Sequence, residues 1–380
     1  MNKIKELIIC SNCVMDTTDT FITFDNKGMC DHCTTFYNYI LPHWNNGLGH
    51  EKKLDRLVSK IKSANKNSDF DCILGMSGGI DSSYLLYLVT KKLNLRPLVF
   101  HVDGGWNSQI AVNNIENLVD GLGLDLFTEV INWEEMKDLQ RSFFKSGVSH
   151  IDTPQDHAFF ASMYKFALNY KVNNILTGAN YSTECVRNPK EWMYFQSDSY
   201  QIKDIHRKFG TKKLKTFPLT NVLFHRFYLP YVKNIKVHRL LDLMEYDKIE
   251  AQTFLENNFK FQKYPQKHFE SRFTKFYESY WLYEKFGYDT RKVQFSSLIL
   301  TKQMTRGEAL QELKSKPYNE SEIVREFNYI ADKLGMTKEE LQDCFDSENK
   351  TYKDYINQEM IYNFGSKISR LVGIEKGGKR

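Results

Sequence analysis

The stretch from Met76 to Ser83, MSGGIDSS, combines residue types that bind phosphate. Gly78 and Gly79 have no Cβ atom, so the backbone can approach an anion closely. Asp81 is a poor direct ligand for phosphate because like charges repel, but its carboxylate suits a Mg²⁺ ion that bridges it to the phosphates. Serine hydroxyls add hydrogen-bond donors: Ser77, Ser82 and Ser83.

The segments on either side of this stretch place it at a strand-to-helix corner. FDCILGM (70–76) is a short apolar run typical of a buried parallel strand. After the stretch, Tyr84, Leu85, Leu88 and Val89 recur at helical spacing. Ligands bind at the carboxyl ends of strands in open parallel sheets, and a helix N-terminus favours an anion. The alternative is an ordinary glycine corner with a serine cap.

The pattern SGGxDS differs from G-x-x-x-x-G-K-[ST], because it has no lysine in place. It resembles the pyrophosphate-binding loop of the PP-loop ATP pyrophosphatases, which split ATP between the α and β phosphates and adenylate a substrate oxygen. The resemblance implies that Asp81 carries Mg²⁺ and that Asp81 and Ser77 are the catalytic residues. It also implies a set of ATP-binding residues in the loop: Met76, Ser77, Gly78, Gly79, Asp81 and Ser82.

Two further strands are predicted to end at the same edge. RPLVFHVDGGW (96–106) ends near His101, Val102 and Asp103, which match the strand that receives the adenosine half of ATP in PP-loop enzymes. NNILTGANY (173–181) brings Gly178 to the same nucleotide. Helices alternate regularly with these strands, which predicts an α/β fold with a doubly wound parallel sheet.

Four N-terminal cysteines have the spacing of a zinc ribbon. Cys10, Cys13, Cys30 and Cys33 form C-x2-C-x16-C-x2-C, in which two knuckles close a tetrahedron around Zn²⁺. Four cysteine ligands fill the tetrahedral coordination of zinc and leave no position for a substrate or water, so the zinc is predicted to be structural. The intervening FITFDNKGMC is predicted to form a short hairpin. The alternatives are two unrelated thiol pairs or a redox pair.

Longer segments resemble the N-acetyl sugar amidotransferase family of PP-loop enzymes. They include CVMDTTDTFITFDNKGMCDHC, SGGIDSSYLLY, LVFHVDGGWNSQIAVNNIENLVDGLGLDL, DTPQDHAFF, ILTGANYSTE, LKTFPL and QKHFESRFTKFYESYWLYEKFGYD. The resemblance implies that an N-acetyl group on a nucleotide-activated sugar becomes an acetamidino group, with ATP and ammonia consumed, for lipopolysaccharide O-antigen or another surface polysaccharide. It implies that a separate glutamine amidotransferase supplies the ammonia, with a barrel-shaped cyclase-like subunit as a further candidate partner.

The substrate residues are predicted from charge and position. The cluster Lys267, His268 and Arg272 is interleaved with aromatic residues, and we expect it to meet an anionic sugar nucleotide. An amphipathic helix with internal salt bridges explains the cluster equally well. Other candidates for substrate contacts are Asn180, Glu184 and Lys215.

Length and patterning predict three regions: a zinc ribbon at 1–45, an ATP pyrophosphatase α/β domain at 46–233 and a helical domain at 234–380. The net charge of +5 is mild, so nucleic-acid binding is not expected. No apolar stretch is long enough to span a bilayer, and MNKIKELIICSNC has too short an apolar run for a signal peptide. We therefore expect a cytoplasmic protein.

Two other functions remain open at this point. Some tRNA thiolases also combine zinc knuckles with SGGxDS, but they need sulfur chemistry from paired cysteines or an iron–sulfur cluster. Of the remaining cysteines, Cys72, Cys185 and Cys344, the sequence predicts only Cys185 near the cleft. The other alternative is a non-catalytic zinc and nucleotide-binding module, which would bind ATP without releasing pyrophosphate.

Overall fold

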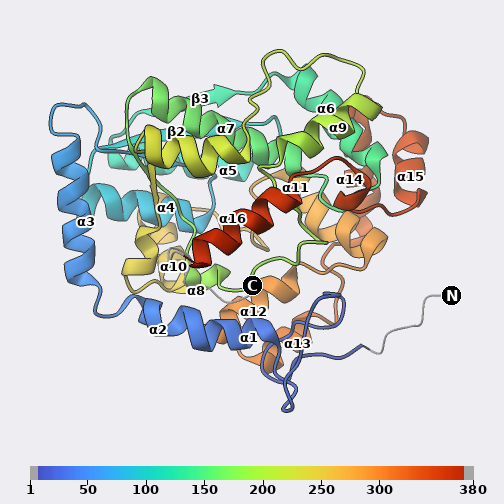
Figure 1. The fold of residues 1–380 in the computed structure, drawn as a ribbon, viewed down its shortest axis with the longest axis horizontal. Helices are drawn as coiled ribbons and strands as arrows, with labels where there is room; N and C mark the ends of the chain where they lie inside the picture. Colours follow the sequence, from blue (N-terminus) through green and yellow to red (C-terminus); the bar gives the residue numbers. More distant parts are fainter. Residues whose placement is uncertain (1–6, 372–380) are drawn as a thin grey trace.

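The computed structural model describes residues 7–371, and its centre is a parallel sheet of five short strands (Figure 1). The order across the sheet is β3-β2-β1-β4-β5, and every neighbouring pair is parallel. The strands are β1 (Cys72–Gly75), β2 (Pro97–Asp103), β3 (Leu126–Val130), β4 (Asn174–Leu176) and β5 (Lys236–His238). The predicted parallel α/β sheet is confirmed.

Helices connect the strands and form most of the remaining chain. The longer ones are α3 (Glu51–Ala64), α4 (Ile80–Tyr87), α5 (Gln109–Leu122), α6 (Trp133–Ser146), α7 (Thr153–Asn169), α9 (Ser199–Phe209), η4 (Phe224–Val232), α10 (Lys248–Phe259), η6 (Tyr277–Phe286), α12 (Arg291–Leu300), α14 (Glu320–Leu334), α15 (Lys338–Asp346) and α16 (Glu359–Leu371). The shorter ones include α1 (Asp31–Thr35), α2 (Leu41–Trp44), α8 (Tyr181–Glu184), η5 (Leu240–Leu243), α11 (Arg272–Phe276) and α13 (Arg306–Glu312).

Both faces of the sheet are covered, as a doubly wound fold requires. Successive strand residues alternate between two hydrophobic cores, because side chains along a strand point to opposite faces. Ile73 and Phe100 pack into the core built with α6, α7 and α9. Leu74 and Val99 pack into the core built with α3, α4, α5 and α10.

The strand order reverses direction at β1. From β1 the chain runs outward through β2 to β3, and it then returns to place β4 on the other side of β1. The crevice beyond the carboxyl ends of β1 and β4 is therefore the topological switch point, where ligands bind in open parallel sheets. The loop after β1 and the loop after β4 both open into this crevice.

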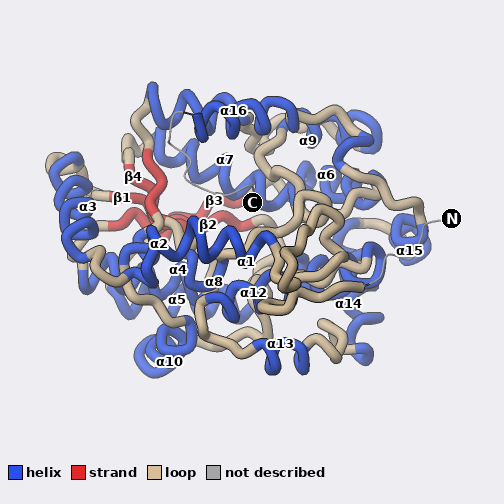
Figure 2. The backbone as a smooth tube through the Cα atoms, turned by 60° about the horizontal axis from the view of Figure 1, so that its bottom comes forward, coloured by secondary structure: helices blue, strands red, loops and turns tan. Residues whose placement is uncertain are grey.

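The N-terminal segment lies beside the C-terminal helices. Figures 1 and 2 both show α1 next to α12. The backbone N–H of Val14 donates to Ser296 Oγ on α12 at 3.2 Å. Arg306, the first residue of α13, donates from Nη2 to the Cys10 carbonyl at 2.8 Å. The first and last regions of the chain therefore share one packed interface.

Several local expectations differ from the structure. The predicted hairpin in residues 21–30 is reduced to a single antiparallel bridge between Phe24 and Cys30. The sheet does not end before residue 233, because β5 follows it, and α10 packs on α4. The helix that carries the charged cluster begins only at Arg272, so Lys267 and His268 precede it and do not share its face. The outer ends of the first and last predicted regions, residues 1–6 and 372–380, lie outside the described residues.

Candidate active site

The loop between β1 and α4 has the geometry of an anion site. Gly78 has a φ of +83°, and a Cβ atom there would lie 3.0 Å from the Ala111 carbonyl oxygen, so only glycine fits without strain. The Gly79 N–H donates to Ser77 Oγ at 3.2 Å, and Ser77 Oγ lies 3.2 Å from Ser82 Oγ. The loop thus holds backbone and hydroxyl donors together at the N-terminus of α4, where the helix dipole favours negative charge.

Asp81, in the first turn of α4, is the centre of a charged cluster. The Tyr246 hydroxyl donates to Asp81 Oδ1. Thr183 Oγ1 lies 3.5 Å from Asp81 Oδ2, and Lys267 Nζ lies 3.6 Å from the same oxygen. Lys267 Nζ also forms a 2.5 Å ion pair with Glu184. Three segments that are distant from Asp81 in sequence therefore converge on its carboxylate.

The charge state of Lys267 follows from these neighbours. Burial alone would lower the pKa of Lys267, but the carboxylates of Glu184 and Asp81 raise it well above its ordinary value. The side chain is therefore an ammonium ion beside the loop. We refer to Asp81, Thr183, Glu184, Tyr246 and Lys267 as the Asp81 cluster.

The segment just before α11 lies across the loop. A bridge between Asn107 and Ser271 and a 2.9 Å hydrogen bond from the Ser108 N–H to the Glu270 carbonyl hold this segment against the loop after β2. A Cβ atom on Gly79 would lie 3.0 Å from Glu270 Oε1. Burial raises the pKa of the Glu270 carboxyl, against the opposing charge of His268. The C-terminal region thus contributes a carboxyl group directly above the loop.

His268 belongs to a second group of charges, in which the Glu278 side chain is buried and the His268 side chain is 40% exposed. Its Nδ1 lies 2.9 Å from Glu278 Oε1. Burial alone would lower the pKa of His268, but the Glu278 carboxylate raises it to about 9. Burial raises the pKa of Asp156 in the same group to about 7, against the opposing charge of His268. His268 is therefore held as a cation by an acidic surrounding made of this chain's own residues.

The end of β2 carries the three residues expected to meet adenosine. His101 Nδ1 lies 2.7 Å from the Met76 carbonyl, and its Nε2 lies 2.8 Å from Asn107 Nδ2, so the ring braces the loop. Val102 is a buried core residue. Asp103 is partly exposed, and its Oδ1 accepts from the Gly105 N–H at 2.7 Å. Asp103 therefore remains our prediction for a direct nucleotide contact, whereas His101 positions the loop.

Residues after β4 adjoin the loop but do not all face the crevice. A Cβ atom on Gly178 would lie 2.8 Å from the backbone nitrogen of Ser82, so this glycine permits the loop after β4 to touch α4. Asn180 is fully buried: its Oδ1 accepts from the Thr183 N–H at 2.9 Å, and its Nδ2 donates to the Gly178 carbonyl at 2.9 Å. The structure shows Asn180 as the N-cap of α8, and a direct substrate contact by this residue stays a prediction.

Two other predicted substrate residues have separate surroundings. The Lys215 N–H donates to Glu135 Oε2 at 3.0 Å, which places Lys215 against the first turn of α6, after β3 and two strands from β1. Arg272 forms two hydrogen bonds with Glu326, at 2.9 and 3.0 Å, and its guanidinium lies 3.4 Å from the centre of the Tyr329 ring. Neither residue joins the Asp81 cluster.

The sequence did not single out Tyr246 and Lys248, which the structure brings next to Asp81 or Lys267. They lie just before α10 and at its first position, far along the chain from the glycine loop. No local spacing could have indicated them. Their only sequence signal is a position after the last strand of the sheet, where the chain returns to the crevice.

The four N-terminal cysteines form a closed cluster. Their Sγ atoms lie within 4.8 Å of one another. The Sγ–Sγ distance is 3.8 Å for Cys10 with Cys33 and 3.6 Å for Cys30 with both Cys13 and Cys33. Sulfurs held at about 2.3 Å from a central Zn²⁺ lie about 3.8 Å apart. All four side chains are fully buried. This donor set and spacing fit a structural zinc ion.

Groups around the cysteines complete this fit. The Cys30 N–H donates to Cys10 Sγ at 3.2 Å, and Asn12 Nδ2 donates to Cys33 Sγ at 3.4 Å. Arg306 Nε donates to the Cys13 carbonyl at 3.0 Å. A Zn²⁺ ion with four thiolate ligands carries a net negative charge, and the Arg306 guanidinium lies beside it. His32 is paired with Asp19 at 3.0 Å and is not one of the clustered donors.

A family model matches the C-terminal part of the chain. Residues 270–369 match the family described as LPS biosynthesis protein WbpG-like, C-terminal domain. This region therefore carries a domain of lipopolysaccharide biosynthesis proteins, and the predicted family resemblance is confirmed there. The match begins at Glu270, the residue whose carboxyl group lies against Gly79. No curated protein matches the chain.

Solved structures with similarity to this chain include two nucleotide-metabolising synthetases. NMN synthetase from Francisella tularensis shares 17% identity over 60% of this chain and 92% of its own, with a TM-score of 0.28. The NH3-dependent NAD synthetase from Campylobacter jejuni subsp. jejuni shares 15% identity over 58% of this chain and 99% of its own, also with a TM-score of 0.28. Within residues 7–371, no helix combines the length and the apolar character needed to cross a membrane.

Proposed function

We propose that this protein is an ATP-dependent amidotransferase that converts the N-acetyl group of a nucleotide-activated sugar to an acetamidino group. One observation carries the proposal. The SGGIDS loop, at the switch point of a parallel sheet, is covered by charged residues that lead into a domain of lipopolysaccharide biosynthesis proteins. A nucleotide-cleaving loop and a domain from sugar-polymer synthesis meet at one site, so the substrate of the activation step is expected to be a sugar.

The chemistry proceeds in two balanced steps. The acetamido oxygen attacks the α-phosphorus of ATP, the bond to the β-phosphate oxygen breaks, and pyrophosphate leaves. The resulting O-adenylyl imidate has a good leaving group on its carbon. Ammonia then adds to that carbon, AMP leaves with the former amide oxygen, and an amidine remains. The protein contributes mainly by positioning the reactants and neutralising charge.

The residues of the loop suit the first of these steps. The backbone around Gly78 and Gly79 and the hydroxyls of Ser77 and Ser82 would hold the pyrophosphate. Asp81 would hold Mg²⁺, with the Tyr246 hydroxyl and Lys267 fixing the orientation of its carboxylate. The ammonium group of Lys267 would offset the negative charge that gathers on the phosphates.

The source of ammonia is proposed to be a separate glutamine amidotransferase, with a cyclase-like subunit as a further candidate partner. A glutaminase of the thiol type needs an activated cysteine. Burial raises the pKa of Cys185, the cysteine next to α8, to about 12, and its Sγ contacts the Ser297 carbonyl at 3.7 Å. Such a thiol is protonated at neutral pH and inert.

The placement of the remaining cysteines disfavours a tRNA thiolase. The three cysteines outside the zinc cluster fall in three different hydrophobic cores: Cys72, Cys185 and Cys344. They are too far apart to act as a redox pair or to hold a cluster among the described residues. Sulfur transfer would therefore need a thiol from another protein.

Product analysis tests the proposal. The full chain is incubated with ATP, Mg²⁺, ammonium and a panel of nucleotide-linked N-acetyl sugars. We expect AMP and pyrophosphate in equal amounts, together with a sugar nucleotide whose mass changes by the exchange of O for NH. Formation of ADP, or of AMP with every sugar unchanged, would exclude the proposed reaction.

A matched pair of variants links the activity to the loop. Asp81→Asn removes the charge that would hold Mg²⁺, and we expect turnover to fall by about 100-fold or more. Asp125→Asn makes the same chemical change at an exposed position before β3, at the opposite edge of the sheet, and should leave turnover unchanged. Equal activity of the two variants would remove Asp81 from the mechanism.

A further inference from the structure

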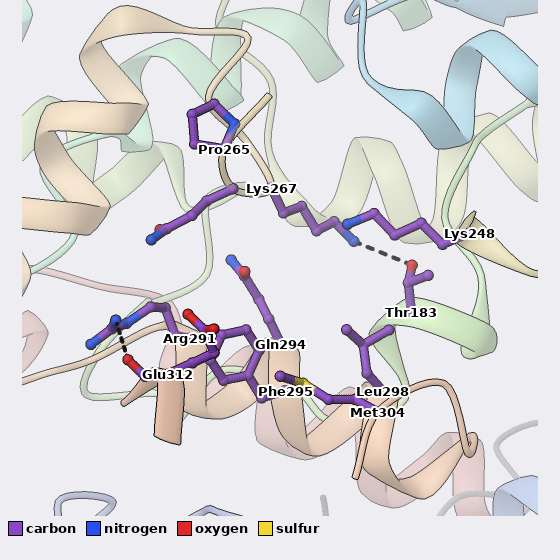
Figure 3. A pocket seen from close by; sticks show the side chains of 11 residues that line it. Thr183, Lys248, Pro265, Lys267, Arg291, Gln294, Phe295, Leu298, Met304 and Glu312 are labelled. Carbon is purple, nitrogen blue, oxygen red and sulfur yellow. Dashed lines mark hydrogen bonds between the residues drawn. The ribbon is translucent and has the colours of Figure 1, made fainter. Parts of the chain in front are cut away.

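A cavity of about 300 Å³ lies next to the Asp81 cluster (Figure 3). Its walls come from α8, from the first residue of α10, from the segment 265–267 and from one side of α12. Thr183 and Lys267 line this cavity, and both also contact Asp81. The cavity therefore adjoins the loop where ATP is proposed to bind, but it is a separate space.

The α12 wall of the cavity is a single helical face. Arg291, Gln294, Phe295 and Leu298 recur at the spacing i, i+3, i+4 and i+7, and all four line the cavity. The opposite face of α12 packs against the cysteine cluster: Val293 and Leu300 belong to the same hydrophobic core as the four cysteines. The buried cysteine cluster thus supports this wall from the opposite side of the helix.

The lining has an apolar side and a polar side. Phe295, Leu298 and Met304 form an apolar floor, and Gln294 extends from that floor into the space (Figure 3). A pyranose ring with an acyl substituent has the matching character, since its C–H face and methyl group are apolar and its hydroxyl edge needs hydrogen-bond partners. Ligand pockets range from about 300 to 1,000 Å³, so a cavity at the lower limit takes one sugar ring but not an attached nucleotide.

Two lysines lie between the cavity and the loop that joins β1 to α4. The side chains of Lys248 and Lys267 extend toward one another above Thr183 (Figure 3). Lys267 is paired with Glu184, whereas the described residues provide no ion pair for Lys248 Nζ. Burial lowers the pKa of Lys248, and the neighbouring charge of Lys267 adds to this effect. The carboxylates of Asp81, Glu184 and Glu270 act on both lysines, but Lys248 forms no direct ion pair with them among the described residues, so its amino group is available to an anionic ligand at this boundary.

We propose that this cavity is the acceptor site, where the N-acylated sugar ring binds against α12 with its acyl group toward Lys267 and Asp81. The nucleotide part of the acceptor then lies outside the cavity. Lys248 neutralises negative charge where the ATP phosphates and the acyl oxygen meet. The inference rests on the proposed function and extends it, because it assigns sugar specificity to Gln294, Phe295 and Leu298 of the C-terminal domain.

Saturation-transfer NMR on the full chain tests this assignment with UDP-N-acetylglucosamine and UDP as paired probes. We expect the sugar-ring and acetyl-methyl protons to receive more saturation than the uridine protons, and UDP alone to receive little. Preferential saturation of uridine, or none on the sugar, would overturn the proposal. ATP is measured separately, so an absence of ATP binding or of AMP formation would count against the proposed function and not against the acceptor site.

Variants in the cavity sharpen the test. Gln294→Ala removes a polar partner without adding bulk and should weaken binding of the sugar nucleotide about 10-fold, with ATP binding unchanged. Leu298→Trp fills the cavity and should abolish saturation of the sugar. Leu223→Trp makes the same change at an exposed position outside the cavity and should bind as the native chain does. Native-like sugar binding by Gln294→Ala and by a folded Leu298→Trp protein, checked by its melting curve, would refute the site.

Discussion

The cysteine cluster and the Asp81 cluster both gather polar side chains, but they are assembled in opposite ways. The four cysteines come from two short knuckles and are all fully buried. The Asp81 cluster draws its members from residues 81 to 267, and the side chains of Asp81 and Glu184 remain 17% and 38% exposed. The first arrangement is complete in itself, whereas the second leaves room for a ligand.

This difference separates a structural role from a chemical one. A tetrahedral site with four sulfur ligands has no open position for a substrate. The Asp81 carboxylate is bordered by a lysine, a tyrosine hydroxyl and the glycine loop, and it remains accessible from the crevice. The helix α12 connects the two regions, since one face packs on the cysteines and the other lines the cavity beside Lys267.

Loss of the metal should have the largest effect of any change considered. Cys30→Ala removes one zinc ligand, and structural zinc contributes roughly 10 kcal/mol or more to the folding of small zinc modules. This is comparable with the whole stability of about 5–15 kcal/mol of an ordinary domain. We expect the variant to lose its bound zinc, measured by elemental analysis, and to expose the N-terminal segment to proteolysis.

Cys344→Ala provides the matched control for this change. Cys344 is also a buried cysteine, but it packs in the core of α14 and α15 and not with the other thiols. Its replacement should keep the zinc content of the native protein and lower the stability only by the cost of a small cavity. A Cys30→Ala protein that kept its metal and its protease resistance would show that the cysteine cluster is not a zinc site.

The two regions also differ in how far the sequence predicts them. The cysteine spacing C-x2-C-x16-C-x2-C brings its ligands together by local geometry, so the residues were identified without a structure. The glycine loop was identified for the same reason. Tyr246 and Lys248 were missed because they approach Asp81 only through the path of the chain after β5.

Burial and backbone conformation add information that the sequence lacks at two further positions. Asn180 carries a side chain typical of a binding site, but Asn is equally typical of a helix cap, and the structure shows it buried as the N-cap of α8. The helical periodicity of residues 267–277 suggested one continuous face. The structure begins the helix at Arg272, because Ser271 caps it and His268 has a positive φ of 67°. Tertiary contacts with the loop after β2 thus override the local pattern.

The charges near the loop should make the stability of this region depend on pH. His268 has a folded pKa of about 9 because of Glu278, above its ordinary value of 6.5. A raised pKa means that the stabilisation is fully present below about pH 6.5 and is lost as the pH rises through about 9. Asp156, with a raised pKa of about 7, acts in the same direction, since its folded form also holds a proton more tightly. The melting temperature should therefore fall between pH 6.5 and 9.5.

One variant isolates the histidine contribution. His268→Asn keeps a residue type that tolerates the positive φ, but it removes the charge. Its melting temperature should be lower at pH 7 and nearly constant between pH 8 and 9.5. The exposed His43 gives a control, because His43→Asn should reproduce the native pH profile. A native profile in His268→Asn would show that the pair with Glu278 does not control this titration.

The smallest effect is expected at Arg272, which lies at the start of α11 and outside the Asp81 cluster. Its pair with Glu326 is partly exposed, with side chains 35% and 17% accessible, so the ion pair and the contact with Tyr329 together contribute about 1 kcal/mol. Arg272→Ala should lower stability by that amount and leave the KM for the sugar nucleotide unchanged, in contrast to Gln294→Ala. An increase of that KM would extend the acceptor site from the cavity to α11, because a purely structural ion pair affects the melting curve and not the affinity for substrate.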